Sequence, residues 1–216
     1  MHRVRQGFVE ERTATINRIR GLLSEFGFVL PQKTIAVRRG VPALLDQLPV
    51  LATRALTDLY AHLALLDERI RDYERQIVQL ARQNEAASRL MAITGVGPII
   101  ALAMVATVGD ARSFDSGRQF AAWLGLVPRQ WSSGGKVRLG RITRRGDAYL
   151  RMLLTLGARS AVQVAQRRTD RMSRWIVQLH SRIGYHKTII AVAAKNARIA
   201  RALLAKGEAL RTTITV

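Results

Sequence analysis

The sequence predicts a mainly α-helical protein, with a long coiled-coil helix followed by a helical domain that carries a helix-hairpin-helix and a small loop or β-hairpin insertion. Apolar residues recur at helical spacing through most of the 216 residues. Between Leu56 and Leu80 this spacing becomes an uninterrupted heptad repeat. Residues 129–142 carry no helical pattern, and their apolar and polar residues alternate around glycines as in a small hairpin.

The first predicted helix contains apolar residues at helical spacing from Val4 to Phe26. Gly27 and Pro31 follow it, and both residue types end helices. A second, short helix is predicted to begin at Pro42, because proline is favoured at the first helical position.

The next helix carries the clearest periodicity in the chain, and charged residues flank its apolar seam. A narrow seam of this kind favours a coiled coil that joins copies of the chain. The alternative is a long helix that packs on its own domain. Three segments are therefore predicted: residues 1–48, an oligomerisation helix over 49–88 and a domain over 89–216. The predicted seam consists of Leu56, Leu59, Leu63, Leu66, Ile70, Tyr73, Ile77 and Leu80.

A helix-hairpin-helix is predicted where an apolar helix from Leu90 meets a glycine-rich turn and a second apolar helix from Pro98. Gly95 and Gly97 permit positive φ in that turn. Backbone N–H groups at such a turn and at the following helix N-terminus offer a binding site for a DNA phosphate. The alternative is an ordinary helical hairpin within a core.

The remaining helices are predicted from their end signals. Asp115 or Ser116 is expected to cap a helix through Leu124, and Asp147 is expected to open the helix after the hairpin. A further helix ends at Gly184, and the last one runs from about His186 to Lys206.

Positive charge is concentrated in the last 88 residues. Residues 129–216 contain 19 Lys and Arg against three acids, whereas residues 1–128 contain 16 against 12. Such an asymmetry indicates a polyanionic partner, and nucleic acid is the first candidate. The predicted DNA-binding residues are Gly95, Gly97, Arg129, Lys136, Arg138, Arg141, Arg144 and Arg145.

Other classes of protein fit the composition poorly. No apolar run approaches the roughly 20 residues that span a bilayer, and the N-terminus lacks the apolar core of a signal peptide. The absence of cysteine excludes disulfides and thiolate–zinc sites and is compatible with a reducing cytoplasm. We therefore expect a cytoplasmic protein without a membrane partner.

Ser132 and Ser133 are the candidate nucleophiles, because they adjoin two glycines and Lys136 within the basic segment. A serine hydroxyl is a weak nucleophile without a base, a metal or a preformed anion site. The neighbouring arginines would stabilise charge on a phosphate in the transition state. A flexible Ser-Gly turn is the alternative, and it is the commoner use of such residues. No spacing of acids or histidines indicates a metal site on this chain.

Several segments together resemble one family, the DEDD-type, bridge-RNA-guided insertion-sequence transposases. The resemblance rests on ITGVGPIIALAMVATVGD, on FDSGRQFAAWLGLVPRQWSSGGKVRLGRITRRGDAYLRMLLTLGARS and on HKTIIAVAAKNARIARALL. It extends to HRVRQGFVEERTATINRIRGLLSEFGFVLP near the N-terminus. Members combine a RuvC-like domain with four metal-binding acids, a coiled coil and a C-terminal transposase domain with a nucleophilic serine.

The resemblance implies DNA transposition through attack of Ser133 on a phosphodiester, with Ser132 as the second choice. It implies DNA, a guide RNA and a dimer or tetramer as partners, in a bacterial, nucleoid-associated protein. Residues 1–48 would be the remnant of the last RuvC-like helix and a connector. We therefore expect no cofactor on this chain, Mg²⁺ only with the missing domain, and no cleavage by the chain alone. The alternatives are a non-catalytic, multimerising DNA-binding regulator and a general helix-hairpin-helix DNA-binding protein.

Overall fold

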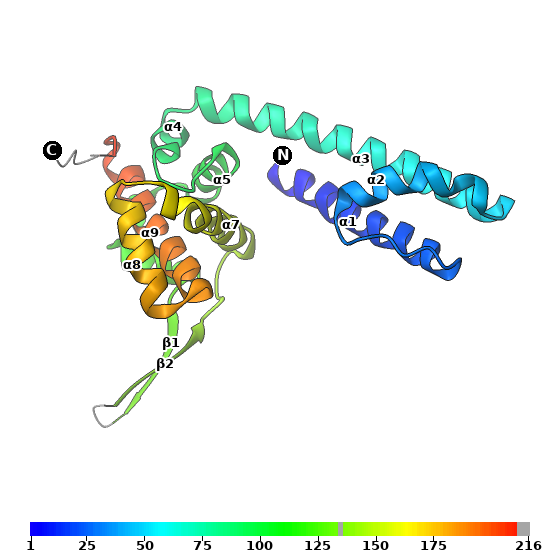
Figure 1. The fold of residues 1–216 in the computed structure, drawn as a ribbon. Coiled ribbons are helices and arrows are strands. Elements are labelled where there is room, and N and C mark those ends of the chain that lie inside the picture. Colours follow the sequence, from blue (N-terminus) through cyan, green and yellow to red (C-terminus); the bar gives the residue numbers. More distant parts are fainter. Residues whose placement is uncertain (134–135, 211–216) are drawn as a thin grey trace. The chain divides into compact units, whose positions relative to one another are not determined.

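The computed structural model describes residues 1–133 and 136–210, without the side chains of Ser132, Ser133, Val137 and Leu139. Over these residues the chain is mainly α-helical, as predicted, with nine α-helices and one two-stranded antiparallel sheet. It divides into two compact units, Met1–Ile77 and Val78–Val216. Figure 1 shows the order of the elements along the chain. None of the helices in the described ranges is both long enough and apolar enough to cross a membrane.

The first unit consists of three α-helices that pack around one apolar core. It contains α1 (His2–Glu25), α2 (Thr34–Leu44), the short 3₁₀ helix η1 (Leu45–Gln47) and most of α3 (Val50–Gln83). The α1 and α3 helices are antiparallel, since the rings of Phe8 and Tyr73 lie with centroids 5.8 Å apart, whereas Glu11, further along α1, lies 2.9 Å from His62, which comes earlier in α3. Apolar residues of all three helices form the core: Ile16, Ile19, Leu23, Val37, Val41, Leu56 and Leu63.

The heptad seam of α3 is buried inside this unit. Leu56 and Leu63 belong to the core with α1 and α2, and Leu66, Ile70 and Ile77 are also buried. Leu59 and Tyr73 are half-buried, whereas Leu80 is 41% exposed. The structure thus follows the second interpretation of the seam, a long helix packed on its own domain. Heptad spacing defines an apolar face but not the chain that covers it, so a seam between copies stays a prediction.

The prediction that a helix begins at Pro42 was wrong. Pro42 lies near the end of α2, which already begins at Thr34. A proline inside a helix cannot donate to the carbonyl four residues earlier. That carbonyl belongs to Arg38, and it accepts a hydrogen bond of 2.9 Å from the Tyr60 hydroxyl of α3 instead. The tertiary contact therefore replaces the hydrogen bond that the proline removes.

The second unit packs its helices around α9 (Tyr185–Lys206), which contacts α4, α6, α7 and α8. Its buried face carries small residues such as Ala193, Ala197 and Ala200, which let the neighbouring helices approach closely. The other helices are α4 (Glu85–Met91), α5 (Pro98–Val108), α6 (Gly117–Trp123), α7 (Ala148–Val164) and α8 (Arg171–Ile183), with the 3₁₀ turns η2 (Ala111–Ser113) and η3 (Ala165–Arg167).

Side-chain caps begin four of these helices, and at the start of α4 the Asn84 side chain accepts from the Ala87 N–H at 2.9 Å. Ser116 accepts from the Gln119 N–H at the start of α6, and Asp147 accepts from the Leu150 N–H at 2.7 Å at the start of α7. Asp170 does the same for α8. Capping by Ser116 and by Asp147 confirms the predicted helix starts, because an oxygen at the N-cap satisfies an otherwise free N–H.

Candidate nucleic-acid interface

A two-stranded hairpin extends from the helices of the second unit (Figure 1). Its strands are β1 (Pro128–Ser133) and β2 (Lys136–Ile142), which confirms the hairpin predicted for this segment. Trp131 pairs with Arg138 and Ser133 with Lys136. The register shifts by one residue between Pro128 and Gln130, so two residues of β2 oppose one of β1 there.

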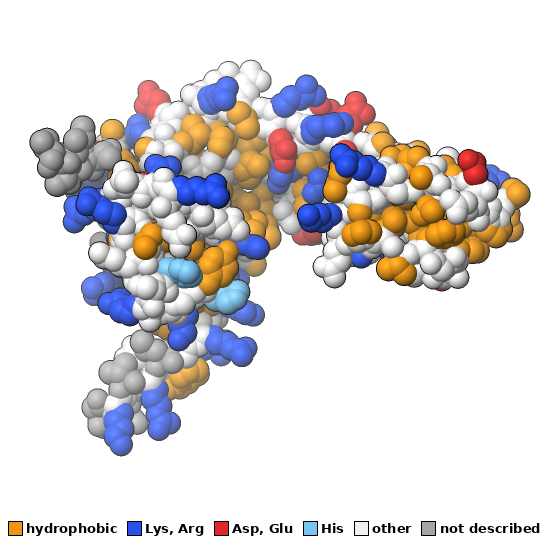
Figure 2. Space-filling model, in the orientation of Figure 1, with side chains coloured by type: hydrophobic (Ala, Val, Ile, Leu, Met, Phe, Trp, Pro, Cys, Tyr) orange, Lys and Arg blue, Asp and Glu red, His pale blue; other side chains and the backbone are white. Residues whose placement is uncertain are grey.

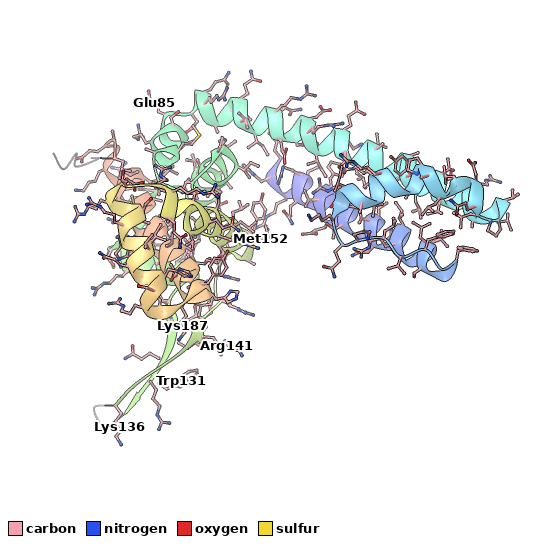
Figure 3. All side chains as sticks on the ribbon, viewed as in Figure 1. Glu85, Trp131, Lys136, Arg141, Met152 and Lys187 are labelled. Carbon is pink, nitrogen blue, oxygen red and sulfur yellow. The ribbon has the colours of Figure 1, made fainter. Side chains whose placement is uncertain are left out.

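Basic side chains gather on this hairpin and on the loop after it (Figures 2 and 3). All six predicted basic residues are exposed, and none forms an ion pair with another residue that the structure describes. Exposed, unneutralised cations are available to bind phosphate. The six residues are Arg129, Lys136, Arg138, Arg141, Arg144 and Arg145.

The two candidate nucleophiles lie at the end of β1. The backbone of Ser132 pairs with Val137 and that of Ser133 with Lys136. Their side chains lie outside the described part of the structure, as do residues 134–135. The backbone thus brings both serines into the same hairpin as four of the predicted DNA-binding residues.

The loop from Thr143 to Asp147 fixes the base of the hairpin. The Thr143 N–H donates to the Val127 carbonyl at 2.9 Å, and the Arg144 N–H donates to the Gly125 carbonyl at 3.2 Å. Arg144 has a positive φ of 56°, which is uncommon for a residue with a side chain. These contacts hold the two ends of the hairpin together.

Arg151 of α7 links the same two segments from the side of the helical core. Its Nη1 donates to the Leu124 carbonyl at 3.1 Å and to the Arg145 carbonyl at 3.2 Å. This role leaves no signal in the sequence, because an arginine at a helix start does not indicate which distant carbonyls it binds. Arg151 therefore positions the loop that carries Arg144 and Arg145.

The predicted helix-hairpin-helix is formed by α4, a turn over residues 92–97 and α5. Gly95 has a positive φ of 86°, as predicted. Gly97 does not: it has φ −90° and ψ 177° and caps α5 without a side chain. The prediction for Gly97 is therefore corrected. A Cβ added to Gly97 would meet nothing within 4 Å, so neither the backbone conformation nor the packing requires glycine at this position.

The turn packs closely on α7 and α9. A Cβ on Gly95 would lie 2.5 Å from the Gly157 carbonyl oxygen, so the two backbones touch. From α9, the buried Asn196 donates its Nδ2 to the Thr94 carbonyl at 2.9 Å. Asn196 was not predicted as a site residue, because the bond spans 102 residues of sequence. Both contacts hold the turn in one conformation.

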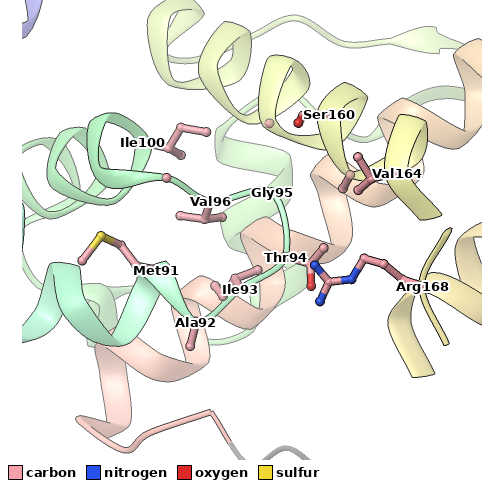
Figure 4. A pocket seen from close by; sticks show the side chains of 13 residues that line it. Met91, Ala92, Ile93, Thr94, Gly95, Val96, Ile100, Ser160, Val164 and Arg168 are labelled. Carbon is pink, nitrogen blue, oxygen red and sulfur yellow. The ribbon is translucent and has the colours of Figure 1, made fainter. Parts of the chain in front are cut away.

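A pocket of about 590 Å³ lies beside this turn (Figure 4). The α4–α5 turn forms one side, α7 contributes Ser160, and Arg168 follows α7. Arg168 also lies 2.9 Å from Asp170, and its side chain remains 53% exposed. The N-terminus of α5 and the Arg168 guanidinium offer donors and positive charge to an anion.

Acidic side chains in the second unit serve as caps rather than as a metal site. Asp170 accepts from the hydroxyl and N–H of Ser173, and the hydroxyl contact is the largest cause that lowers the pKa of Asp170 to about 2. Asp110 accepts from the Arg112 N–H at 2.9 Å. Within residues 1–133 and 136–210, no three acidic or histidine side chains come together in a group that fits a metal ion.

Comparisons with known proteins agree on one family. Residues 87–173 match the family described as "Transposase IS116/IS110/IS902 family". The chain is 48% identical to the "Probable family 20 transposase" of Pseudomonas aeruginosa, over 95% of this chain and 62% of that protein. It is 40% identical to the "Transposase for insertion sequence element IS1111A" of Coxiella burnetii, over 97% and 58%. A third relative, the "Transposase for insertion sequence element IS1328" of Yersinia enterocolitica, is 36% identical over 96% and 62%. The chain thus spans about three-fifths of the length of these relatives.

Proposed function

We propose that this chain is the DNA-binding and strand-transfer part of a transposase, because residues 87–173 match the IS116/IS110/IS902 transposase family. One observation carries the proposal: the strand β1 ends in two serines, and the same hairpin carries four exposed cations. None of the four forms an ion pair with another residue that the structure describes. They are Arg129, Lys136, Arg138 and Arg141. Cations in this arrangement bind the phosphates on both sides of the bond to be broken.

The proposed reaction is attack of the Ser133 hydroxyl on a DNA phosphodiester, with Ser132 as the second choice. The Oγ–P bond forms while the bond from phosphorus to one sugar oxygen breaks. The hydroxyl proton leaves to a base, and the released sugar oxygen takes up a proton. The reverse reaction with a different sugar hydroxyl joins the new strand. The nearby guanidinium groups stabilise the charge on the phosphate oxygens in the transition state.

The α4–α5 turn is the proposed second contact with DNA. Gly97, which precedes the first turn of α5, and Arg168 both line the pocket beside this turn. A backbone phosphate fits the free N–H groups and the positive end of the helix. This contact is independent of sequence and holds the duplex while the hairpin reaches the reacting bond.

The resemblance to insertion-sequence transposases implies further partners, and we include them in the proposed function. They are a guide RNA, other copies of the chain and, for the metal-binding acids, a RuvC-like domain with Mg²⁺. Because the α3 seam is covered by α1 and α2, assembly of copies requires another surface or an exchange of helices. Light scattering of the purified protein measures the number of copies directly.

The nucleophile is tested in a chimera in which residues 1–216 replace the matching segment of the Pseudomonas aeruginosa relative. A DNA substrate with a nick beside the reacting bond traps the covalent intermediate, and mass spectrometry identifies the modified serine. We expect the adduct with the wild-type segment and with Ser132→Ala, and none with Ser133→Ala. DNA affinity should stay within twofold in both variants.

Two other outcomes contradict parts of the proposal. An adduct that survives Ser133→Ala but not Ser132→Ala reverses the choice of nucleophile. Recombination that survives the double substitution excludes attack by either serine and leaves DNA binding as the role of this hairpin. Failure of the wild-type chain to bind DNA at low salt contradicts the proposal as a whole.

A further inference from the structure

Trp131 is an exposed aromatic residue in the middle of the basic hairpin. Its side chain is 59% exposed, although tryptophan is a residue that folding normally buries to a large extent. The two other tryptophans of the unit are more enclosed: Trp123 stacks on Phe120, and Trp175 lies under the Lys195 ammonium at 3.8 Å. Trp131 has no comparable aromatic partner within the described residues, so the helical core does not explain its position.

The backbone of β2 supports the indole ring. A Cβ on Gly140 would lie 2.3 Å from Cζ3 and 2.8 Å from Cη2 of Trp131. Only glycine therefore lets the six-membered ring lie against the strand at this point. This contact restrains the ring, while more than half of the side chain stays accessible.

Cations flank the ring on the same face of the hairpin. Arg138 is the cross-strand partner of Trp131, and Lys136 occupies the next position on that face because side chains alternate along a strand. Figure 3 shows Trp131 and Lys136 along the hairpin. The backbone of Ser133, which pairs with Lys136, is two residues or about 6.6 Å along β1 from Trp131.

An accessible aromatic ring beside phosphate-binding cations is the arrangement that binds unpaired nucleotides. A base stacks on the ring while the cations contact its backbone. Bases within a duplex already stack on one another, so they do not offer a free face to the ring. The arrangement therefore favours a strand with at least one base out of the duplex.

We propose that Trp131 is a stacking site for an unpaired DNA base beside the phosphodiester that the hairpin contacts, with Arg138 and Lys136 on the flanking phosphates. The inference rests on the proposed function, since it requires that the hairpin binds DNA. It adds a preference for locally unpaired DNA, which a purely electrostatic surface does not have. The competing explanation is that the ring only shields Gly140 in the sheet.

The test compares two labelled DNA probes, an oligothymidylate of about 12 nucleotides and a duplex of the same length, by fluorescence anisotropy at constant low salt. For Trp131→Leu we expect the affinity for the single strand to fall about tenfold, or about 1.4 kcal/mol. The affinity for the duplex should change less than twofold. Trp131→Phe is the matched control, because it keeps an aromatic face and should retain most of the single-strand affinity.

A second measurement keeps Trp131 in place, so its result does not depend on whether the hairpin folds when this residue is replaced. In the variant Trp123→Phe, Trp175→Phe, Trp131 is the remaining tryptophan, and its emission should be quenched by the oligothymidylate but not by the duplex. Equal losses for both probes in Trp131→Leu, or no quenching on saturation with the single strand, overturn the stacking proposal while leaving DNA binding intact. Absence of binding to either probe by the wild-type chain instead contradicts the proposed function.

Discussion

Replacing Gly157 by alanine tests the close contact between the α4–α5 turn and α7. The new Cβ would lie 2.0 Å from the Gly95 carbonyl oxygen and 2.7 Å from Cδ1 of Ile100. Non-bonded carbon contacts are normally about 3.5–4.0 Å, so the backbones must separate by about 1.5 Å. The Ile100 methyl group is able to rotate away, but the Gly95 carbonyl belongs to the backbone of the turn.

The expected cost follows from this overlap. Overpacking of a core typically costs about 1–3 kcal/mol, and a clash with backbone belongs in the upper half of that range. With a urea m-value of about 2 kcal/mol/M, a loss of about 2 kcal/mol lowers the unfolding midpoint by about 1 M. Circular dichroism at 222 nm during urea titration measures this shift, because the second unit is mostly helical.

Gly97→Ala is the matched control for this substitution. It lies in the same turn and has a negative φ, and its added Cβ meets no atom within 4 Å. Its free energy of unfolding should therefore stay within about 0.5 kcal/mol of the wild type. If Gly157→Ala and Gly97→Ala unfold at the same urea concentration, the inferred contact between the turn and α7 is incorrect.

Four further predictions concern the charges and the packing. Arg138→Gln should make the slope of log K against log salt for DNA binding less negative by about 1, whereas an unchanged slope would mean that Arg138 contacts no phosphate. Because the pKa of Asp170 is depressed to about 2, its stabilising contribution is present above the unfolded value near 3.8 and is lost as the pH falls through about 2. The difference in urea midpoint between wild type and Asp170→Ala should therefore shrink between pH 4 and pH 2, and a constant difference would contradict the ionised cap. Leu63→Ala should destabilise the first unit by about 2–5 kcal/mol without lowering the mass in light scattering, and a folded protein of lower mass would instead support a seam between copies. Tyr60→Phe should cost about 1 kcal/mol in thermal unfolding because the Arg38 carbonyl loses its donor, and a smaller change would indicate that water replaces it.

Local signals in the sequence predicted much of the second unit. Ser116 and Asp147 cap their helices because the geometry of an N-cap involves only residues that are close in sequence. The alternation of apolar and polar residues around the glycines of residues 129–142 predicted a loop or small hairpin, because this signal too is local in the sequence. Gly95 was identified with its positive φ, since a tight turn between two helices requires one.

The features that sequence reasoning missed depend on residues far apart in the chain. Heptad spacing on α3 revealed the apolar face, but α1 and α2 cover it, and nothing in the spacing names the partner. Pro42 was predicted to begin a helix because proline is favoured at the first helical position. The contact that lets it lie inside α2 could not be predicted, because the Tyr60 hydroxyl is 22 residues from the Arg38 carbonyl that it binds. The same holds for Asn196, whose amide reaches the α4–α5 turn from the last helix.

The base of the hairpin separates a segment that can vary from the helical core that carries it. The backbone leaves the helical core at Val127 and returns at Thr143, where the two residues share a hydrogen bond of 2.9 Å. Insertions, deletions or exchanges between these two points alter the length and chemistry of the hairpin but leave the entry and exit of the chain unchanged. We therefore expect that a hairpin from a relative, grafted in place of residues 128–142, leaves the packing of the helical core unchanged.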